Sequence, residues 1–186
     1  RPLVIEVQGL VGAATGPPRR VAQGIPSGRL ALLLAVLERR CQVALAASDV
    51  FVSTVGGLRV NEPAADLGVA LALVSAVTGI AIGEEVVACG EIGLAGEIRQ
   101  VQATERRLAE AARLGFRRAV VPRSAPDGPM ELELLRAGTL LEAVRLLLGV
   151  DPAARSRSRT DSGSGLELSG GRDVRSLVRN PPSLVS

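Results

Sequence analysis

The sequence predicts a mixed α/β (α+β) domain over residues 1–150. Segments with strand-like alternation and segments with helical spacing follow one another along the chain. The chain has 186 residues, of which 47% are hydrophobic, enough for one packed core. Only Phe51 and Phe116 are aromatic, so we expect this core to be aliphatic and closely packed.

The first 40 residues predict two strands and a helix. Alternating apolar residues at 2–11 and 19–25, with a Gly/Pro break between them, indicate strands that pair as a hairpin. Leucines at helical spacing predict a helix over 27–40. Ser27 is a candidate N-cap, and Arg39 and Arg40 suit the negative end of the helix dipole.

The next segment predicts strands at 49–55 and 56–60, with the glycines at 56–57 marking a turn or bulge. In RVNEPAADLGVALAL (residues 59–73), Pro63 suits the first turn of a helix, and the apolar spacing carries that helix to Thr78. Ala64 and Ala65 stand in a first turn that would be exposed, but the absence of a lysine or histidine base favours their interpretation as helix-packing residues. They offer no reactive group where free helix N–H groups could bind or activate a ligand.

Beyond this helix, five further segments complete the predicted domain. We expect β-rich segments at 84–94 and 96–101, a helix over 107–116 closed by Gly115, a strand at 117–122, and one or two helices over 131–149. From Asp151 the composition changes to Ser, Gly, Arg and Pro. Such a segment buries too little apolar surface to offset its ordering entropy, which predicts a disordered tail over residues 151–186.

The residue types exclude several kinds of catalysis. All 22 basic residues are arginine, and the chain has no Lys, His, Tyr or Trp. Ser-His-Asp, Cys-His and Ser-Lys nucleophiles, Schiff-base lysines and a phosphate-loop lysine are therefore unavailable. Cys41 and Cys89 stand in apolar contexts and are expected to be buried thiols, neither a disulfide nor a metal site. We expect no cofactor and no metal in this chain.

The charge balance is only weakly basic. Residues 1–150 hold 16 arginines and 15 acidic residues, and residues 151–186 hold 6 and 4. DNA binding would therefore need arginines gathered on one face. The candidates are Arg19, Arg20, Arg29, Arg39, Arg40 and Arg59. Scattered arginines on a solvated surface remain the alternative. With no signal peptide and no membrane-spanning run, we expect a soluble, cytoplasmic chain without a membrane partner.

Three blocks in order carry a family resemblance: LLLAVLERR, DVFVSTVGGLRVNEPAADLGVALALVSA, and GEIGLAGEIRQV followed by RLAEAARLGFRRAVVP. Together they resemble the carboxy-terminal domain of the RadA (Sms) family of bacterial DNA repair ATPases, over about residues 1–148. That domain is similar to the proteolytic domain of Lon proteases. The resemblance therefore implies a ribosomal protein S5 domain 2-like, Lon-protease-like fold.

The resemblance also implies what this chain lacks. The Lon nucleophilic serine falls on Ala64 and the dyad lysine falls near Glu105, so both catalytic positions are substituted. It implies that this chain is no enzyme, but part of a DNA-dependent ATPase that acts in recombinational repair and branch migration. ATP, Mg²⁺ and Zn²⁺ would belong to domains upstream of Arg1. The implied partners are single-stranded and branched DNA, a recombinase, and further copies in a hexameric ring.

Two alternatives stay open at this point. One is an active Lon-class Ser-Lys peptidase, which the missing dyad disfavours. The other is a relative such as the small domain of chelatase-like or competence proteins. A phosphate loop followed by a KNRFG motif upstream would favour the RadA-like ATPase over this relative.

Overall fold

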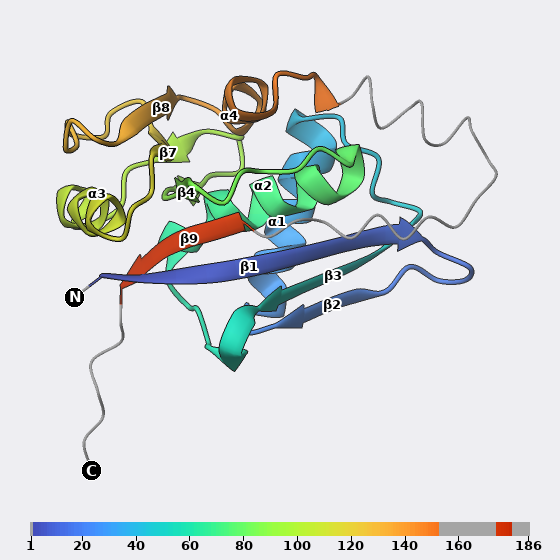
Figure 1. The fold of residues 1–186 in the computed structure, drawn as a ribbon. Helices are drawn as coiled ribbons and strands as arrows, with labels where there is room; N and C mark the ends of the chain where they lie inside the picture. Colours follow the sequence, from blue (N-terminus) through green and yellow to red (C-terminus); the bar gives the residue numbers. More distant parts are fainter. Residues whose placement is uncertain (1, 153–173, 180–186) are drawn as a thin grey trace, which may run out of the picture.

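The computed structural model describes residues 2–152 and 174–179, which form a seven-stranded sheet covered by helices (Figure 1). The strand order is β2-β3-β1-β9-β4-β7-β8, and β5 and β6 form a separate pair. The mixed α/β class expected from the sequence is confirmed. The strands are β1 (Pro2–Ala13), β2 (Arg20–Gln23), β3 (Ser48–Thr54), β4 (Val86–Ala88), β5 (Glu91–Ile92), β6 (Ile98–Arg99), β7 (Arg118–Pro122), β8 (Glu133–Ala137) and β9 (Val174–Arg179).

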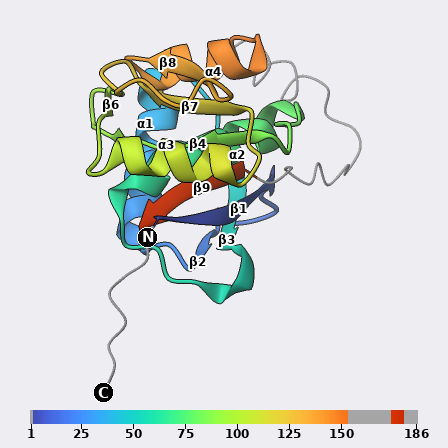
Figure 2. The same ribbon diagram turned by 60° about the vertical axis from the view of Figure 1, so that its left-hand side comes forward.

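Helix α2 occupies the centre of the molecule. It contacts β1, β9 and β4 of the sheet, and it has α1 and α4 as helical neighbours (Figure 2). Every residue from Asp66 to Thr78 is buried, as expected for a helix of Leu, Val, Ala and Gly on all sides. The helical segments are α1 (Ser27–Arg40), α2 (Asp66–Thr78), α3 (Thr104–Arg113) and α4 (Leu140–Leu148), with 3₁₀ turns η1 (Val55–Gly57) and η2 (Pro63–Ala65).

The predicted hairpin between the first two strands is wrong. β1 pairs antiparallel with β3, in a register that sets Gly9 opposite Val52, whereas β2 pairs parallel with β3. Two parallel strands need a crossover between them, and α1 supplies it. The Gly/Pro break after β1 therefore carries the chain past β3 to the edge of the sheet.

Three local predictions also fail. Residues 133–137, expected to be helical, form β8, which pairs parallel with β7 from Arg118–Glu133 to Pro122–Ala137. Local spacing did not reveal this, because the pairing depends on β7, a separate segment of the chain. Residues 56–60, expected to be a strand, leave the sheet through η1, where Gly56 adopts a φ of +79°. Ser27 is the first residue of α1 instead of its cap, which is Pro26. The four main helices predicted at 27–40, from Pro63 to Thr78, at 107–116 and within 139–149 are confirmed.

The expectation of a disordered tail fails for six of its residues. Val174–Arg179 form β9, which lies between β1 and β4. Composition averaged over the tail hides the short segment VRSLVR, whose valines and leucine suit a strand. The other predicted tail residues, 153–173 and 180–186, lie outside the described residues, and the boundary at residue 150 stays a prediction.

No helix in the described part of the chain is long and apolar enough to cross a membrane.

Candidate functional site

The two alanines singled out by the sequence are buried, not exposed. Ala64 and Ala65 form η2 with exposed fractions of 0% and 3%. The backbone around them is already bonded to the loop after β4: Gly90 N–H donates to the Ala64 carbonyl at 3.1 Å, and Leu67 N–H donates to the Gly90 carbonyl at 3.1 Å. This helix start therefore presents neither a reactive side chain nor an open first turn to solvent.

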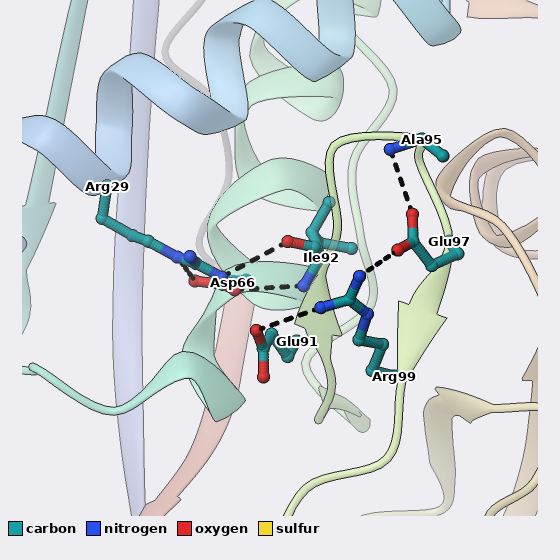
Figure 3. Close-up of polar contacts among 7 residues, drawn as sticks. All are labelled: Arg29, Asp66, Glu91, Ile92, Ala95, Glu97 and Arg99. Carbon is teal, nitrogen blue, oxygen red and sulfur yellow. Dashed lines mark hydrogen bonds and ion pairs between the residues drawn. The ribbon is translucent and has the colours of Figure 1, made fainter.

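Directly after the alanines, Asp66 holds a buried ion pair with Arg29 (Figure 3). Its carboxylate accepts hydrogen bonds from Arg29 Nε at 2.7 Å, from Arg29 Nη2, and from Ile92 N–H at 3.0 Å. Arg29 also reaches the Ile92 carbonyl, at 3.3 Å. We call these three residues the Asp66 node. It ties the first turn of α1 and the first turn of α2 to β5.

Burial dominates the electrostatics of this node. It raises the pKa of Asp66, against the opposing effects of the Arg29 and Ile92 hydrogen bonds. The hydrogen bond to Asp66 raises the pKa of Arg29. With Asp66 only 2% exposed, removal of its cation would leave a buried carboxylate without a counter-charge. Arg29 is therefore engaged within the fold.

A second, more exposed group of charges surrounds the node. Arg99 lies between Glu97, at 2.5 Å, and Glu91, at 3.9 Å. Ala95 N–H donates to the other Glu97 oxygen at 3.1 Å. Hydrogen bonds from its own backbone and from Arg99 lower the pKa of Glu97. These contacts hold the β5–β6 turn in place beside the node (Figure 3).

Another buried cation reaches the start of α2 from α3. Arg107 has no exposed surface; its Nη2 donates to Glu62, and its Nε donates to the Gln102 carbonyl at 2.9 Å. Glu62 directly precedes Pro63, so this pair ties α3 to η2. Glu105, to which the resemblance assigns the lysine position, lies on the exposed side of α3.

Sequence reasoning missed both buried charges, although a signal for Arg107 was available. Thr104, Arg107, Leu108 and Ala111 recur at helical spacing and form the buried side of α3. Asp66 gave no comparable signal, because an acidic residue in a first helical turn is common at the surface as well.

The two cysteines are free and buried, as expected. Burial raises the pKa of each thiol to about 12, so neither is a thiolate at neutral pH. Within residues 2–152 and 174–179, no three His, Cys, Asp or Glu residues are grouped so that they could hold a metal ion.

The six candidate DNA-binding arginines do not converge at one point. Arg29 and Arg40 stand at opposite ends of α1, roughly 16 Å apart along its axis. Arg20 donates to carbonyl groups of Leu45 and Ser48, in the segment that follows α1.

Several of these arginines already have partners in the fold. Arg19 pairs with Asp49 at 2.8 Å and lies over the Phe51 ring. Arg40 Nε donates to the Leu94 carbonyl at 3.3 Å. Arg39 and Arg59 are exposed, and neither has a hydrogen-bond or ion-pair partner among the described residues.

Comparison with known proteins gives extended similarity to DNA repair protein RadA. The chain is 47% identical to RadA of Mycolicibacterium smegmatis over 147 residues, 79% of this chain and 32% of that protein. It is 48% identical to RadA of Escherichia coli over 134 residues, 69% of this chain and 29% of that protein. It is 39% identical to RadA of Halalkalibacterium halodurans over 153 residues, 80% of this chain and 34% of that protein. The chain thus spans about a third of the length of these relatives.

A family described as subunit ChlI of Mg-chelatase matches residues 34–125. This stretch includes the second half of α1 and all of α2 and α3, whereas Arg29 of the Asp66 node lies before it. It contains no lysine, so it carries no phosphate-loop lysine for a nucleotide.

Breaking the Asp66 node should cost far more stability than breaking a surface pair. Arg29→Ala leaves Asp66 buried and unpaired, and we expect it to lower the free energy of unfolding by about 3–5 kcal/mol. Arg145→Ala removes the cation of an exposed pair with Asp151 and should cost less than about 1 kcal/mol. Urea denaturation of both variants measures the difference. Equal losses would show that the node is not the stronger constraint.

Proposed function

Most of this chain is homologous to a part of the bacterial DNA repair protein RadA. We therefore propose that it is the Lon-like, non-proteolytic domain of a RadA-type DNA-dependent ATPase. In this proposal the domain has the S5 domain 2-like fold. The parent protein acts in recombinational repair, on single-stranded and branched DNA, as a hexameric ring that works with a recombinase. ATP hydrolysis with Mg²⁺ and a zinc finger are assigned to other parts of the parent, since this chain has no phosphate-loop lysine.

The start of α2 is the observation that carries the non-proteolytic part of the proposal. A Lon-type peptidase needs a serine nucleophile and a lysine base that takes its proton. The corresponding helix start holds the methyl group of Ala64. The buried cation beside it belongs to Arg107, whose guanidinium stays protonated in proteins and cannot act as a base. The two buried thiols, with pKa values near 12, offer no substitute nucleophile.

We further propose that Arg107, not Glu105, occupies the former place of the base. Its side chain points into the fold and bonds Glu62, two residues before Ala64, whereas Glu105 faces solvent. The Arg107–Glu62 pair would then replace a catalytic interaction with a structural one.

The expected peptidase activity of the unmodified chain is zero. Ala64→Ser with Glu105→Lys should stay inactive, because an amine at residue 105 lies in solvent. Ala64→Ser with Arg107→Lys places a serine hydroxyl and a lysine amine at the start of α2. This variant tests whether the fold still allows the Lon-type arrangement of nucleophile and base. Hydrolysis of a fluorogenic peptide is the readout. Turnover by the unmodified chain would overturn the proposal. If, of the two double variants, only Ala64→Ser/Glu105→Lys is active, the assignment of Arg107 is overturned.

The proposed DNA contact rests on arginines that the fold leaves unengaged. Arg39 and Arg59 are exposed and have no partner within the described part of the chain. Arginine suits a phosphate because its planar fork donates two parallel hydrogen bonds. Arg19 and Arg20 are exposed as well, but would have to share their donors with Asp49 and with carbonyl groups.

We further propose that the domain serves as an oligomerisation scaffold through β2, which lies at an edge of the sheet formed by the described strands. This edge carries exposed apolar side chains on β2 and on the segment after β3, namely Val21, Val55 and Leu58. An edge strand with neighbouring apolar surface is suited to contact with another subunit.

The DNA prediction separates free arginines from structural ones. In the full-length protein, Arg39→Ala and Arg59→Ala should each lower the magnitude of the log-log salt slope for single-stranded DNA by roughly 0.7. Arg113→Ala is the matched control, because Arg113 is exposed but paired with Glu110 on α3. Fluorescence anisotropy at several salt concentrations gives the slope, and light scattering checks that the oligomer persists. If affinity and slope are unchanged in the Arg39/Arg59 double variant, the domain is a scaffold without a DNA-contact role at these residues.

A further inference from the structure

Strand β9 holds the two halves of the main sheet together. It pairs antiparallel with β1, where Ile5 lies opposite Ser176 and Glu6 opposite Arg175. On its other side it pairs parallel with β4, where Val87 lies opposite Arg175 and Ala88 opposite Ser176. Without β9, one half would be β2-β3-β1 and the other β4-β7-β8 (Figures 1 and 2).

The space that β9 fills is lined by peptide groups and by buried apolar residues. Val7 of β1 and Val87 and Ala88 of β4 have no exposed surface. If this space were empty, the facing N–H and C=O groups of two strands would lose their partners, which is costly inside a protein. Beside the sheet, β9 contacts α2 and the η2 turn that contains Ala64.

β9 is also separated in sequence from every element that it touches. It follows α4, whose last residue is Leu148, whereas its two strand neighbours end at Ala13 and Ala88. Closing a chain segment over such a distance costs entropy, so the strand must be held by the contacts that it makes between β1 and β4. Those contacts include backbone pairing on both sides of the strand, the usual way in which an added strand is recognised.

We propose that the slot between β1 and β4 is a binding site for an extended peptide, and that residues 174–179 of the same chain are its tethered occupant. The site recognises its ligand through the backbone, with one antiparallel and one parallel ladder. A free peptide of the same sequence therefore binds the slot when the tethered strand cannot. The slot runs beside η2, where Ala64 stands at the proposed position of the Lon nucleophile. In this proposal the domain binds an extended peptide at the place where a Lon-type peptidase would cleave one.

A disulfide tests whether the occupant comes from the same chain. Glu6 and Arg175 are register partners, within the Cα separation that a disulfide spans. Oxidation of Glu6→Cys/Arg175→Cys should give an intramolecular bond, visible as a monomer of altered mobility on a non-reducing gel. Glu6→Cys/Val178→Cys is the control, because Val178 pairs with Leu3 instead. The buried native thiols, with pKa values of about 12, should not compete. Cross-links between chains, or no preference over the control, overturn the proposal.

A peptide-binding experiment tests whether the slot accepts a ligand in trans. Ser176→Pro removes a backbone donor from the middle of β9 and should free the slot. A fluorescent peptide of residues 172–180 should bind this variant at least about tenfold more tightly than the unmodified chain, a difference of about 1.4 kcal/mol. Ser183→Pro, beyond the strand, is the control and should bind like the unmodified chain.

A peptide with proline in place of Ser176 should fail to compete for the freed slot. Equal binding of the labelled peptide by the unmodified chain and the Ser176→Pro variant would overturn the proposal. Circular dichroism checks that the variant is folded; if it is not, the disulfide result decides. Neither experiment depends on peptidase or DNA-binding activity, so its failure leaves the proposed function standing.

Discussion

The ion pair between Arg29 and Asp66 is the constraint on which the arrangement of this molecule depends. It lies where α1 and α2 begin, and it includes the Ile92 N–H of β5. Because every residue of α2 is buried, the position of this helix fixes the packing of the sheet on one side and of α1 and α4 on the other. A buried charge pair tolerates little displacement, since either partner alone would be unsatisfied. The node therefore sets where α2 starts.

The same node and the Arg107–Glu62 pair explain why this helix start carries no exposed chemistry. Asp66 and Glu62 flank η2, and each is engaged by an arginine from a different helix. A guanidinium is not a general base in proteins, so neither arginine replaces the lysine and histidine that the chain lacks. The two ion pairs thus tie α1 and α3 to the start of α2.

The sequence predicts the helices well and the sheet poorly. Apolar spacing and the left-handed Gly79 mark α2, because these signals are local. The partners of β2 and β8 could not be predicted, since strand pairing depends on segments distant in sequence. β9 was hidden by the polar composition around it. Arg107 could have been found from its helical spacing, whereas the burial of Asp66 depends on Arg29, 37 residues earlier.

A double-mutant cycle on Arg29 and Asp66 tests the central claim most directly. The free energy of unfolding is measured for the unmodified chain, Arg29→Ala, Asp66→Ala and the double variant. If the node is the main constraint, the double variant should be more stable than the sum of the single losses predicts, with a coupling energy of about 2 kcal/mol or more. Single losses that add within about 0.5 kcal/mol would contradict the account, because two residues that do not depend on each other cannot fix the start of α2.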